Sequence, residues 1–191
     1  MVNVSVGVSN RHVHLKKEDL EVLFGKDYEL EVKKELTQPG TFASTSVVTL
    51  KTDKGVIENV RVLGPTRDYT QVEISKTDAY KLGINPPVRN SGDLSGSCCV
   101  TLIGTKGEIT IEEGVIIATR HIHLSEEHIK KYNLDKNKTV SIKINGEKGG
   151  ILNNVYLKVL PNSYLELHLD TDDANAHLIN NGDIVEVIYE R

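Results

Sequence analysis

Cysteine is scarce in this 191-residue chain, and its scarcity removes two classes of protein. The only two cysteines, Cys98 and Cys99, are neighbours, and adjacent cysteines rarely pair because the bridge strains the peptide between them. The sequence therefore excludes a disulfide framework, and it contains no CxxC zinc knuckle. We expect both cysteines to be buried or half-buried free thiols, without a neighbouring histidine that would activate them as nucleophiles.

An excess of basic residues and a long apolar run are also missing. The net charge is -4 with both signs mixed along the chain, which excludes a basic stripe for nucleic acid. No run approaches the roughly 18 apolar residues of a membrane span, and the N-terminus lacks the features of a secretory signal. We therefore expect a cytoplasmic protein without membrane or nucleic-acid partners. A hydrophobic content of 38% suffices for one ordinary core or two small ones.

What the sequence does contain is an internal repeat built around two His-x-His pairs. The stretch RHVHL at 11–15 returns as RHIHL at 120–124. Residues 8–25 and 117–134 align at an offset of 109, with the arginine, both histidines, the leucine, an acidic residue and an apolar one in common. Duplication of one small domain explains this pattern.

A second pair of aligned segments lies later in each half. Residues 59–84 match 154–179 at an offset of 95, which places Glu73 directly over His168. The smaller offset implies an insertion in the first half, most simply within 32–55, where we expect a substrate loop. Each half thus offers one His-x-His pair and one further metal-binding side chain.

Local patterns favour strands at these positions. Residues i and i+2 of a strand point to the same face, so both histidines of each pair converge on one point. Glu73 and His168 lie in alternating segments, TQVEIS and YLELHLD, each followed by an acidic helix start. The helix caps that we expect are Ser125, Ser75 or Thr77, and Asp170 or Thr171.

The remaining chain reads as short strands with tight turns. Hairpins are predicted at 53–55 and at 145–146. We predict a mainly β protein with short α-helices, made of two small β-barrel domains related by a pseudo-twofold axis and capped by helices. The first domain covers 1–88 and the second 89–191, with strands open to exchange between the halves. The Pro-, Gly- and Ser-rich stretch 85–97 is the expected crossing.

The repeat-related side chains form two candidate metal sites, listed here in chain order: His12, His14 and Glu73, then His121, His123 and His168. Three imidazoles, or two and a carboxylate, leave an open position on zinc, as in catalytic sites. Three other interpretations stay open: a mononuclear iron oxygenase, a hydrolase using zinc-bound water, and a metal-binding module without activity. The remaining histidines of the predicted helices, His128 and His177, are expected to be solvated or structural.

Cationic side chains are weaker candidates. Arg67 lies in the turn GPTRDYT, six residues before Glu73, and either a solvated arginine or an oxyanion-binding one fits this place. Lys33, Lys34 and Arg61 near the insertion are solvated charges by default. Phosphate loops of the GxxxxGK[ST] and GxGxxG types are absent, which argues against a nucleoside triphosphatase or a Rossmann dehydrogenase.

Seven ordered motifs resemble one family, the PduL-type phosphotransacylases (phosphate propanoyltransferases). They span nearly the whole chain: SNRHVHL at 9–15, LTQPGTFA at 36–43, NVRVLGP at 59–65, TQVEIS at 70–75, KLGINPPVRNSGDLSGS at 81–97, EGVIIATRHIHL at 113–124 and LELHLDTDDANA at 165–176. The resemblance implies two helix-capped β-barrels, a dinuclear zinc site between them, and acyl transfer between coenzyme A and phosphate. Its substrates would be acyl-CoA, phosphate and acyl phosphate, with acetyl and propanoyl groups equally compatible.

The resemblance also implies roles for single residues. Two zinc ions per chain would be held by the two histidine groups above, and Arg67 would hold phosphate. Coenzyme A contacts map onto Ser9, Lys34, Arg61, Leu63 and Asn175. The chain departs from the family in two places: Cys98-Cys99 stands where members often have Pro-Gly, and the turn around Arg67 varies.

The expected mechanism is direct attack of phosphate on the thioester, because no nucleophile lies beside a base in the repeated motifs. A covalent acyl-cysteine on Cys98 or Cys99 is the rival mechanism. Relatives in bacterial microcompartments carry an N-terminal targeting extension; here SNRHVHL starts at residue 9, and we expect no such extension. The sequence leaves a homodimer open.

Overall fold

The computed structural model describes residues 2–189, which form two compact β units. One unit consists of the residues up to Ser9 together with the segment from Thr119 onward, and the other runs from Asn10 to Ala118. The domain boundary placed after residue 88 by the sequence falls inside this second unit. The reason is strand pairing: strands of residues 98–118 complete the barrel of 10–118, whereas the N-terminal strand pairs with C-terminal ones.

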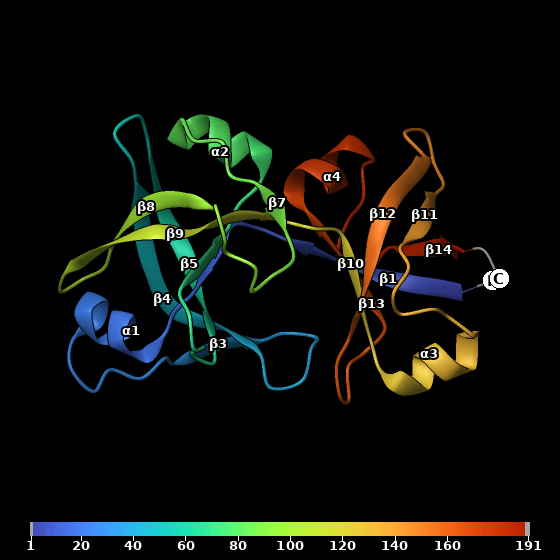
Figure 1. Cartoon of the computed structure of the whole chain (residues 1–191), viewed down its shortest axis with the longest axis horizontal. Coiled ribbons are helices and arrows are strands. Elements are labelled where there is room, and N and C mark those ends of the chain that lie inside the picture. Colours follow the sequence, from blue (N-terminus) through green and yellow to red (C-terminus); the bar gives the residue numbers. More distant parts are fainter. Residues whose placement is uncertain (1, 190–191) are drawn as a thin grey trace. The chain divides into compact units, whose positions relative to one another are not determined.

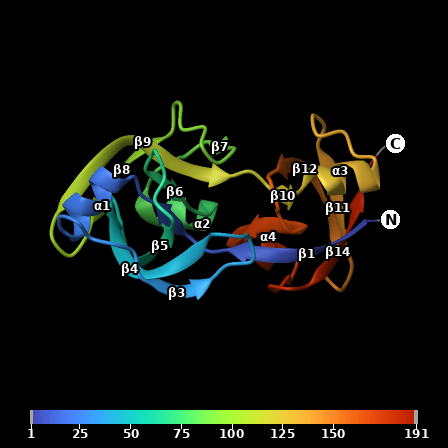
Figure 2. The same cartoon turned by 90° about the horizontal axis from the view of Figure 1, so that it is seen from below.

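The unit of residues 10–118 contains a closed ring of six strands. In ring order these are β4 (Phe42–Lys51), β5 (Val56–Gly64), β2 (His12–His14), β6 (Gln71–Glu73), β9 (Glu108–Ala118) and β8 (Cys98–Ile103), which pairs with β4 again. Two short strands extend the ring, β3 (Val32–Glu35) beside β4 and β7 (Val88–Arg89) beside β9. The helices α1 (Lys17–Phe24) and α2 (Lys76–Leu82) lie outside the barrel and apart from each other (Figures 1 and 2).

The other unit is a closed barrel of the same size. Its strand order is β1 (Val2–Ser9), β13 (Glu166–Asp170), β10 (His121–Leu124), β12 (Gly150–Val159), β11 (Val140–Ile144) and β14 (Ile184–Ile188). The helices of this unit are α3 (Glu126–Tyr132) and α4 (Thr171–Ala176). Both barrels together confirm the predicted class, a mainly β protein with short helices and two small barrels.

The two barrels repeat one pairing pattern. In each, the His-x-His strand lies between a parallel and an antiparallel neighbour: β2 between β5 and β6, β10 between β12 and β13. The strand that precedes each His-x-His strand pairs elsewhere, since β1 leads into β2 but pairs with β13 and β14. Likewise β9 leads into β10 but pairs with β6 and β8. The repeat seen in the sequence is therefore a repeat of strand topology.

Alternation along the His-x-His strands decides which face carries the histidines. Val13 lies between the two histidines of β2 and is fully buried in one hydrophobic core, with Val72 of β6. Ile122 and Leu167 occupy the same places in the core of the other barrel. Burial of each of these apolar side chains stabilises the folded state by about 1.5–3 kcal/mol. Because strand neighbours point to opposite faces, the histidines lie on the outer face of each barrel wall.

Turns and caps follow the local patterns. Tight connections join β4 to β5 and β11 to β12, where both hairpins were predicted, and β3 lies within the predicted insertion. Ser75, Ser125 and Asp170 cap their helices by accepting a hydrogen bond from a backbone N–H three residues later. Between residues 2 and 189, no helix has the length and apolar character needed to cross a membrane.

Candidate metal centres

The first ligand group is brought together by β2 and β6. His12 lies directly opposite Glu73 in the antiparallel pair, and His14 follows on the same face of β2. A ligand atom of each of the three residues lies within 4.8 Å of those of the other two. The Nε2 atom of His12 is 3.5 Å from Oε2 of Glu73, and two ligand atoms on a tetrahedral zinc lie about 3.4 Å apart. The donor atoms and their spacing fit a zinc ion.

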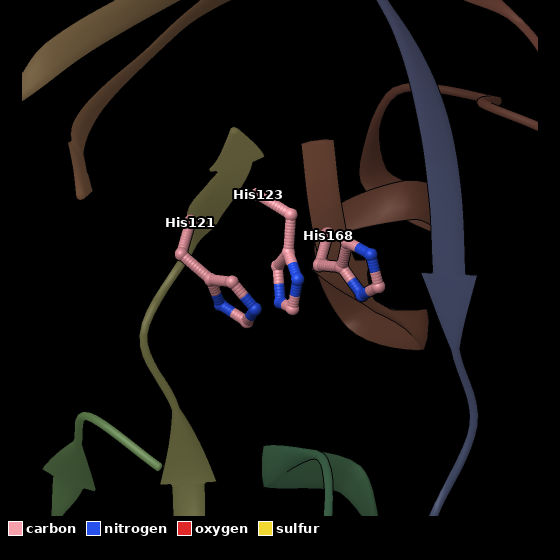
Figure 3. A group of neighbouring side chains, drawn as sticks. All are labelled: His121, His123 and His168. Atoms are coloured by element: carbon pink, nitrogen blue, oxygen red, sulfur yellow. The ribbon is translucent and has the colours of Figure 1, made fainter. Parts of the chain in front are cut away.

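The second ligand group uses the equivalent positions of β10 and β13. His121 lies opposite His168, as His12 lies opposite Glu73. The three imidazole rings gather on one face, with centroids 4.9 Å apart for His121 and His123, and 4.5 Å for His123 and His168 (Figure 3). One ligand atom from each ring lies within 4.8 Å of the others. Three nitrogen donors would leave the fourth position of a tetrahedral zinc ion unfilled by protein, as in catalytic zinc sites.

Backbone carbonyls orient the first histidine of each pair. Nδ1 of His12 lies 2.9 Å from the carbonyl oxygen of Asn10, and Nδ1 of His121 lies 2.8 Å from that of Thr119. A carbonyl can only accept, so Nδ1 carries the proton in both rings and Nε2 presents its lone pair. This is a common arrangement for metal-binding histidines, and here it is built twice from the residue two positions earlier.

The arginine that precedes each pair anchors the ligand strand to the following helix. Arg11 donates from Nε to Asp78 at 2.8 Å, and Arg120 donates from Nε and Nη2 to Asp173 at 2.7 Å each. Both carboxylates belong to the helix that follows the third ligand. These hydrogen bonds raise the pKa of Arg11 and of Arg120 above the ordinary value.

The pairing of these arginines with aspartates was not among the predictions from the sequence, although the repeat contains the pattern that indicates it. The same offsets that align the histidines and Glu73 with His168 also align Arg11 with Arg120 and Asp78 with Asp173. A recurring arginine and a recurring aspartate in two copies of one domain indicate a pair. Only the contacts of the folded chain establish it.

Arg67 is linked to the first ligand group through two polar residues. Its Nη1 atom donates to Ser91 Oγ at 3.2 Å and to Tyr69 Oη at 3.3 Å. Ser91 Oγ also accepts from Nε2 of Gln71 at 2.9 Å, and the same amide nitrogen donates to Oε1 of Glu73 at 2.6 Å. The guanidinium is therefore held at a half-buried position, connected to Glu73 by way of Ser91 and Gln71.

Two of the residues assigned to coenzyme A by resemblance lie in one row with His14. In the strand register Lys34 is opposite Ala43, Ala43 is opposite Leu63, and Leu63 is opposite His14. Lys34 is exposed on β3 and Leu63 is half-buried on β5. A ligand extended along this row would run from Lys34, in the inserted segment of the first half, to His14 of the first ligand group.

Arg61 lies opposite His12 on the neighbouring strand. Its Nη1 atom donates to the carbonyl oxygens of Ser44 and Thr45, at 3.1 and 2.8 Å. The guanidinium is thus fixed against β4 beside the first ligand group.

The other two residues assigned to coenzyme A belong to the unit that contains the N-terminal strand. Ser9 pairs with Asp170, the cap of α4, and Asn175 is exposed within that helix. Both therefore lie near the end of β13, which carries His168. The five assigned residues divide three to two between the units.

The remaining candidates have structural surroundings. Nδ1 of His128 accepts from the N–H of Ser125 in a capping box, and Nδ1 of His177 lies 2.8 Å from the carbonyl oxygen of Lys148. Cys98 is half-buried against the core, whereas Cys99 is exposed, contrary to the expectation that both are at least half-buried. Partial desolvation of the exposed Cys99 thiol and the nearby charge of Glu112 raise its pKa, which lowers the thiolate fraction at neutral pH.

Fold and side chains define a protein of two β-barrels, each with a three-ligand group on its outer face. Residues 5–180 match the phosphate propanoyltransferase family. The chain is 51% identical to the phosphate propanoyltransferase of Thermotoga maritima over 97% of its own length and 89% of the relative's. Identity to the Priestia megaterium enzyme of that name is 50% (94% and 83% covered), and to the Salmonella typhimurium one 45% (91% and 82%).

The chain belongs to the phosphate propanoyltransferase family. It is a phosphotransacylase, an enzyme of the acyltransferase class, with coenzyme A as a substrate or product.

Proposed function

We propose that the chain converts acyl-CoA and inorganic phosphate reversibly into acyl phosphate and coenzyme A, with two zinc ions per chain acting together as a dinuclear site. Acetyl- and propanoyl-CoA are the proposed acyl donors. One observation carries this proposal: each barrel presents a three-ligand group at the same register position, in a chain of a phosphotransacylase family. We also propose that the protein works in the cytoplasm, where acyl-CoA, phosphate, acyl phosphate and coenzyme A are all dissolved.

The residues of the two ligand groups would hold one zinc ion each. His12, His14 and Glu73 offer two neutral nitrogens and one carboxylate, and the second group offers three nitrogens. When bound, zinc supplies Lewis acidity, which stabilises negative charge on the thioester carbonyl oxygen and on the departing thiolate sulfur.

Arg67 is proposed to bind and orient phosphate. Its side chain is held by Ser91 and Tyr69, and a guanidinium pairs with phosphate oxygens through parallel N–H donors. A phosphate oxygen attacks the carbonyl carbon, the C–S bond breaks, and the sulfur leaves as the thiolate of coenzyme A. Phosphate dianion is already nucleophilic near neutral pH, so positioning supplies much of the rate gain.

The proposed coenzyme A contacts are those implied by the resemblance. Lys34, Arg61 and Leu63 lie on adjacent strands beside β2, which supports a binding strip along them. Ser9 and Asn175 are proposed to contact the same coenzyme A molecule from β1 and α4. A covalent acyl-cysteine is disfavoured, because Cys98 packs against the core and the pKa of Cys99 is raised.

The decisive experiment is the formation of thioester from acetyl phosphate and coenzyme A, followed by ultraviolet absorbance, with metal content measured on the same samples. Protein as isolated, stripped with a chelator and then restored with zinc should be active, inactive and active, with two zinc ions per chain in the active states. Propanoyl phosphate is assayed in parallel to establish the acyl preference.

Two results would contradict the proposal. Full activity of protein from which both metal ions have been removed would exclude a role for zinc. Thioester cleavage that proceeds equally fast without phosphate would instead indicate a hydrolase using zinc-bound water.

A further inference from the structure

Beside each ligand group lies one further polar residue, which is buried and occupies a repeat-equivalent position. Gln71 lies opposite His14, and Glu166 lies opposite His123, in the same antiparallel register. Each is two residues before the third ligand and so shares its face of the strand. Gln71 is 0% exposed and Glu166 is 7% exposed. A buried amide and a buried carboxylate at these two places need hydrogen-bond partners.

In the first group the partner of Gln71 is the ligand Glu73. Nε2 of Gln71 donates to Oε1 of Glu73 at 2.6 Å, while Oε2 of Glu73 lies 3.5 Å from Nε2 of His12. The two carboxylate oxygens thus have separate roles, one facing the amide and one facing the histidine. Gln71 is itself fixed, because its carbonyl oxygen accepts from the N–H of Gly92 at 2.7 Å and its Nε2 donates to Ser91.

In the second group the partner of Glu166 is the ligand His168. Oε2 of Glu166 lies 2.9 Å from Nε2 of His168, at the distance of a charge-assisted hydrogen bond. Glu166 packs against Gly7 of β1: a Cβ atom on residue 7 would lie 3.2 Å from Cδ of Glu166 and 3.3 Å from its Oε1. The glycine therefore leaves room for the carboxylate of Glu166 beside β1, the strand that pairs in parallel with β13.

The chemistry of each partner matches its ligand. A carboxylate ligand accepts hydrogen bonds, and its partner is an amide that donates one. An imidazole ligand has an N–H to donate, and its partner is a carboxylate that accepts it. The two copies of the domain differ at the third ligand, which is Glu73 in one and His168 in the other. The partner differs with it: Gln71 donates to Glu73, and Glu166 accepts from His168. Each set consequently contains one carboxylate.

We propose that Gln71 and Glu166 are positioning residues that orient the third metal ligand of each group. Gln71 fixes Oε1 of Glu73 and so directs Oε2 toward the metal. Glu166 accepts a hydrogen bond from Nε2 of His168 and so fixes the orientation and the tautomer of this ring. This inference rests on the zinc sites of the proposed function. Such outer partners commonly change metal affinity by roughly 10–100-fold.

The first test measures zinc affinity at the two groups by competition with a chromophoric chelator, with metal content determined by mass spectrometry. Glu166→Gln should weaken one of the two zinc ions by roughly 10–100-fold and leave the other unchanged. Gln71→Leu should weaken the other ion instead. Glu186→Gln on β14, a carboxylate paired with Lys143 at the surface, is the matched control and should leave both affinities within about twofold of wild type.

The second test uses rescue, which a merely structural role would not produce. Glu73→His gives the first group three histidines but leaves the amide of Gln71 beside the new ligand. The double variant Gln71→Glu/Glu73→His recreates the pairing of Glu166 with His168 and should bind zinc at least about tenfold more tightly than Glu73→His alone.

The outcomes separate the inference from the proposed function. Unchanged zinc affinity in both Glu166→Gln and Gln71→Leu would overturn the inference while leaving the zinc sites intact, and so would a double variant no tighter than Glu73→His. Wild-type protein that binds no zinc at either group would remove the proposed function, and the inference with it. Far-ultraviolet circular dichroism checks that each variant is folded, and Glu166→Gln, which changes one atom of the side chain, decides the matter if Gln71→Leu does not fold.

Discussion

Removal of Arg11 should destabilise its unit more than removal of Arg120 destabilises the other. Both arginines pair with a carboxylate of the following helix, and their own side chains are similarly exposed, 36% and 33%. The carboxylates differ, because Asp78 is 3% exposed and Asp173 is 22% exposed. Arg11→Met would leave a buried charge that water can barely reach, whereas Arg120→Met leaves one that water can partly solvate.

The expected magnitudes follow from this difference. Removing one partner of a fully buried ion pair costs about 3–5 kcal/mol, and an exposed pair contributes about 0–1 kcal/mol. Arg11 is over a third exposed, so we expect about 2–3 kcal/mol for Arg11→Met. For Arg120→Met we expect about 1 kcal/mol, closer to the exposed limit. Asp78 keeps its capping contacts with Ser75 in the variant, which limits the loss to the arginine's share.

The assay is amide hydrogen exchange of zinc-free protein, read out in peptides that cover β2 and β6 for one unit and β10 and β13 for the other. Zinc is removed because a ligand that binds the folded state would add its own stabilisation. Exchange resolves the free energy of opening in each unit separately, which a single unfolding curve of a two-unit protein does not.

A double variant provides the control. Arg11→Met/Asp78→Asn removes the charge that Arg11→Met leaves behind, so it should recover part of the lost stability. Equal losses for the two arginines, or a double variant less stable than Arg11→Met, would refute the argument from burial.

Three further predictions concern activity and the cysteines. Arg67→Ala should raise the apparent KM for phosphate about tenfold or more, with little change in the KM for coenzyme A. Arg67→Lys should raise the KM for phosphate less, because lysine keeps the positive charge but lacks the parallel N–H donors of a guanidinium. An unchanged KM for phosphate in Arg67→Ala would exclude a role of Arg67 in phosphate binding. The double variant Cys98→Ser/Cys99→Ser should keep wild-type activity in the thioester assay, and a trapped acyl-enzyme that disappears in it would establish the covalent mechanism instead. Partial desolvation and the charge of Glu112 raise the pKa of Cys99, so alkylation of this thiol in a Cys98→Ser background should reach half its maximal rate at a higher pH than for a free cysteine. Glu112→Gln should lower the pH of that midpoint. A midpoint at or below that of free cysteine would contradict the assignment.

Much of the candidate site could be predicted from the sequence, because the same pattern of candidate ligands occurs in both halves of the chain. Alternation with a period of two places His12 and His14 on one face of a strand whatever that strand pairs with. The offset of 95 residues then aligns Glu73 with His168, and the register places both opposite the first histidine of their pair. These features are local, or are copied from one half to the other, so no knowledge of the tertiary fold was needed.

The tertiary structure alone decided which barrel each strand completes and which polar groups meet. β1 is continuous in sequence with β2 yet pairs with β13, and strand alternation is identical for either partner, so the sequence boundary after residue 88 falls inside a unit. Arg11 and Asp78 are 67 residues apart, and Gln71 and Ser91 are 20 apart. Such contacts depend on long-range packing and on the orientation of single side chains. Periodicity along the chain determines which face of a strand each side chain lies on. Hydrogen bonding between distant segments determines which strand and which polar group lie beside it.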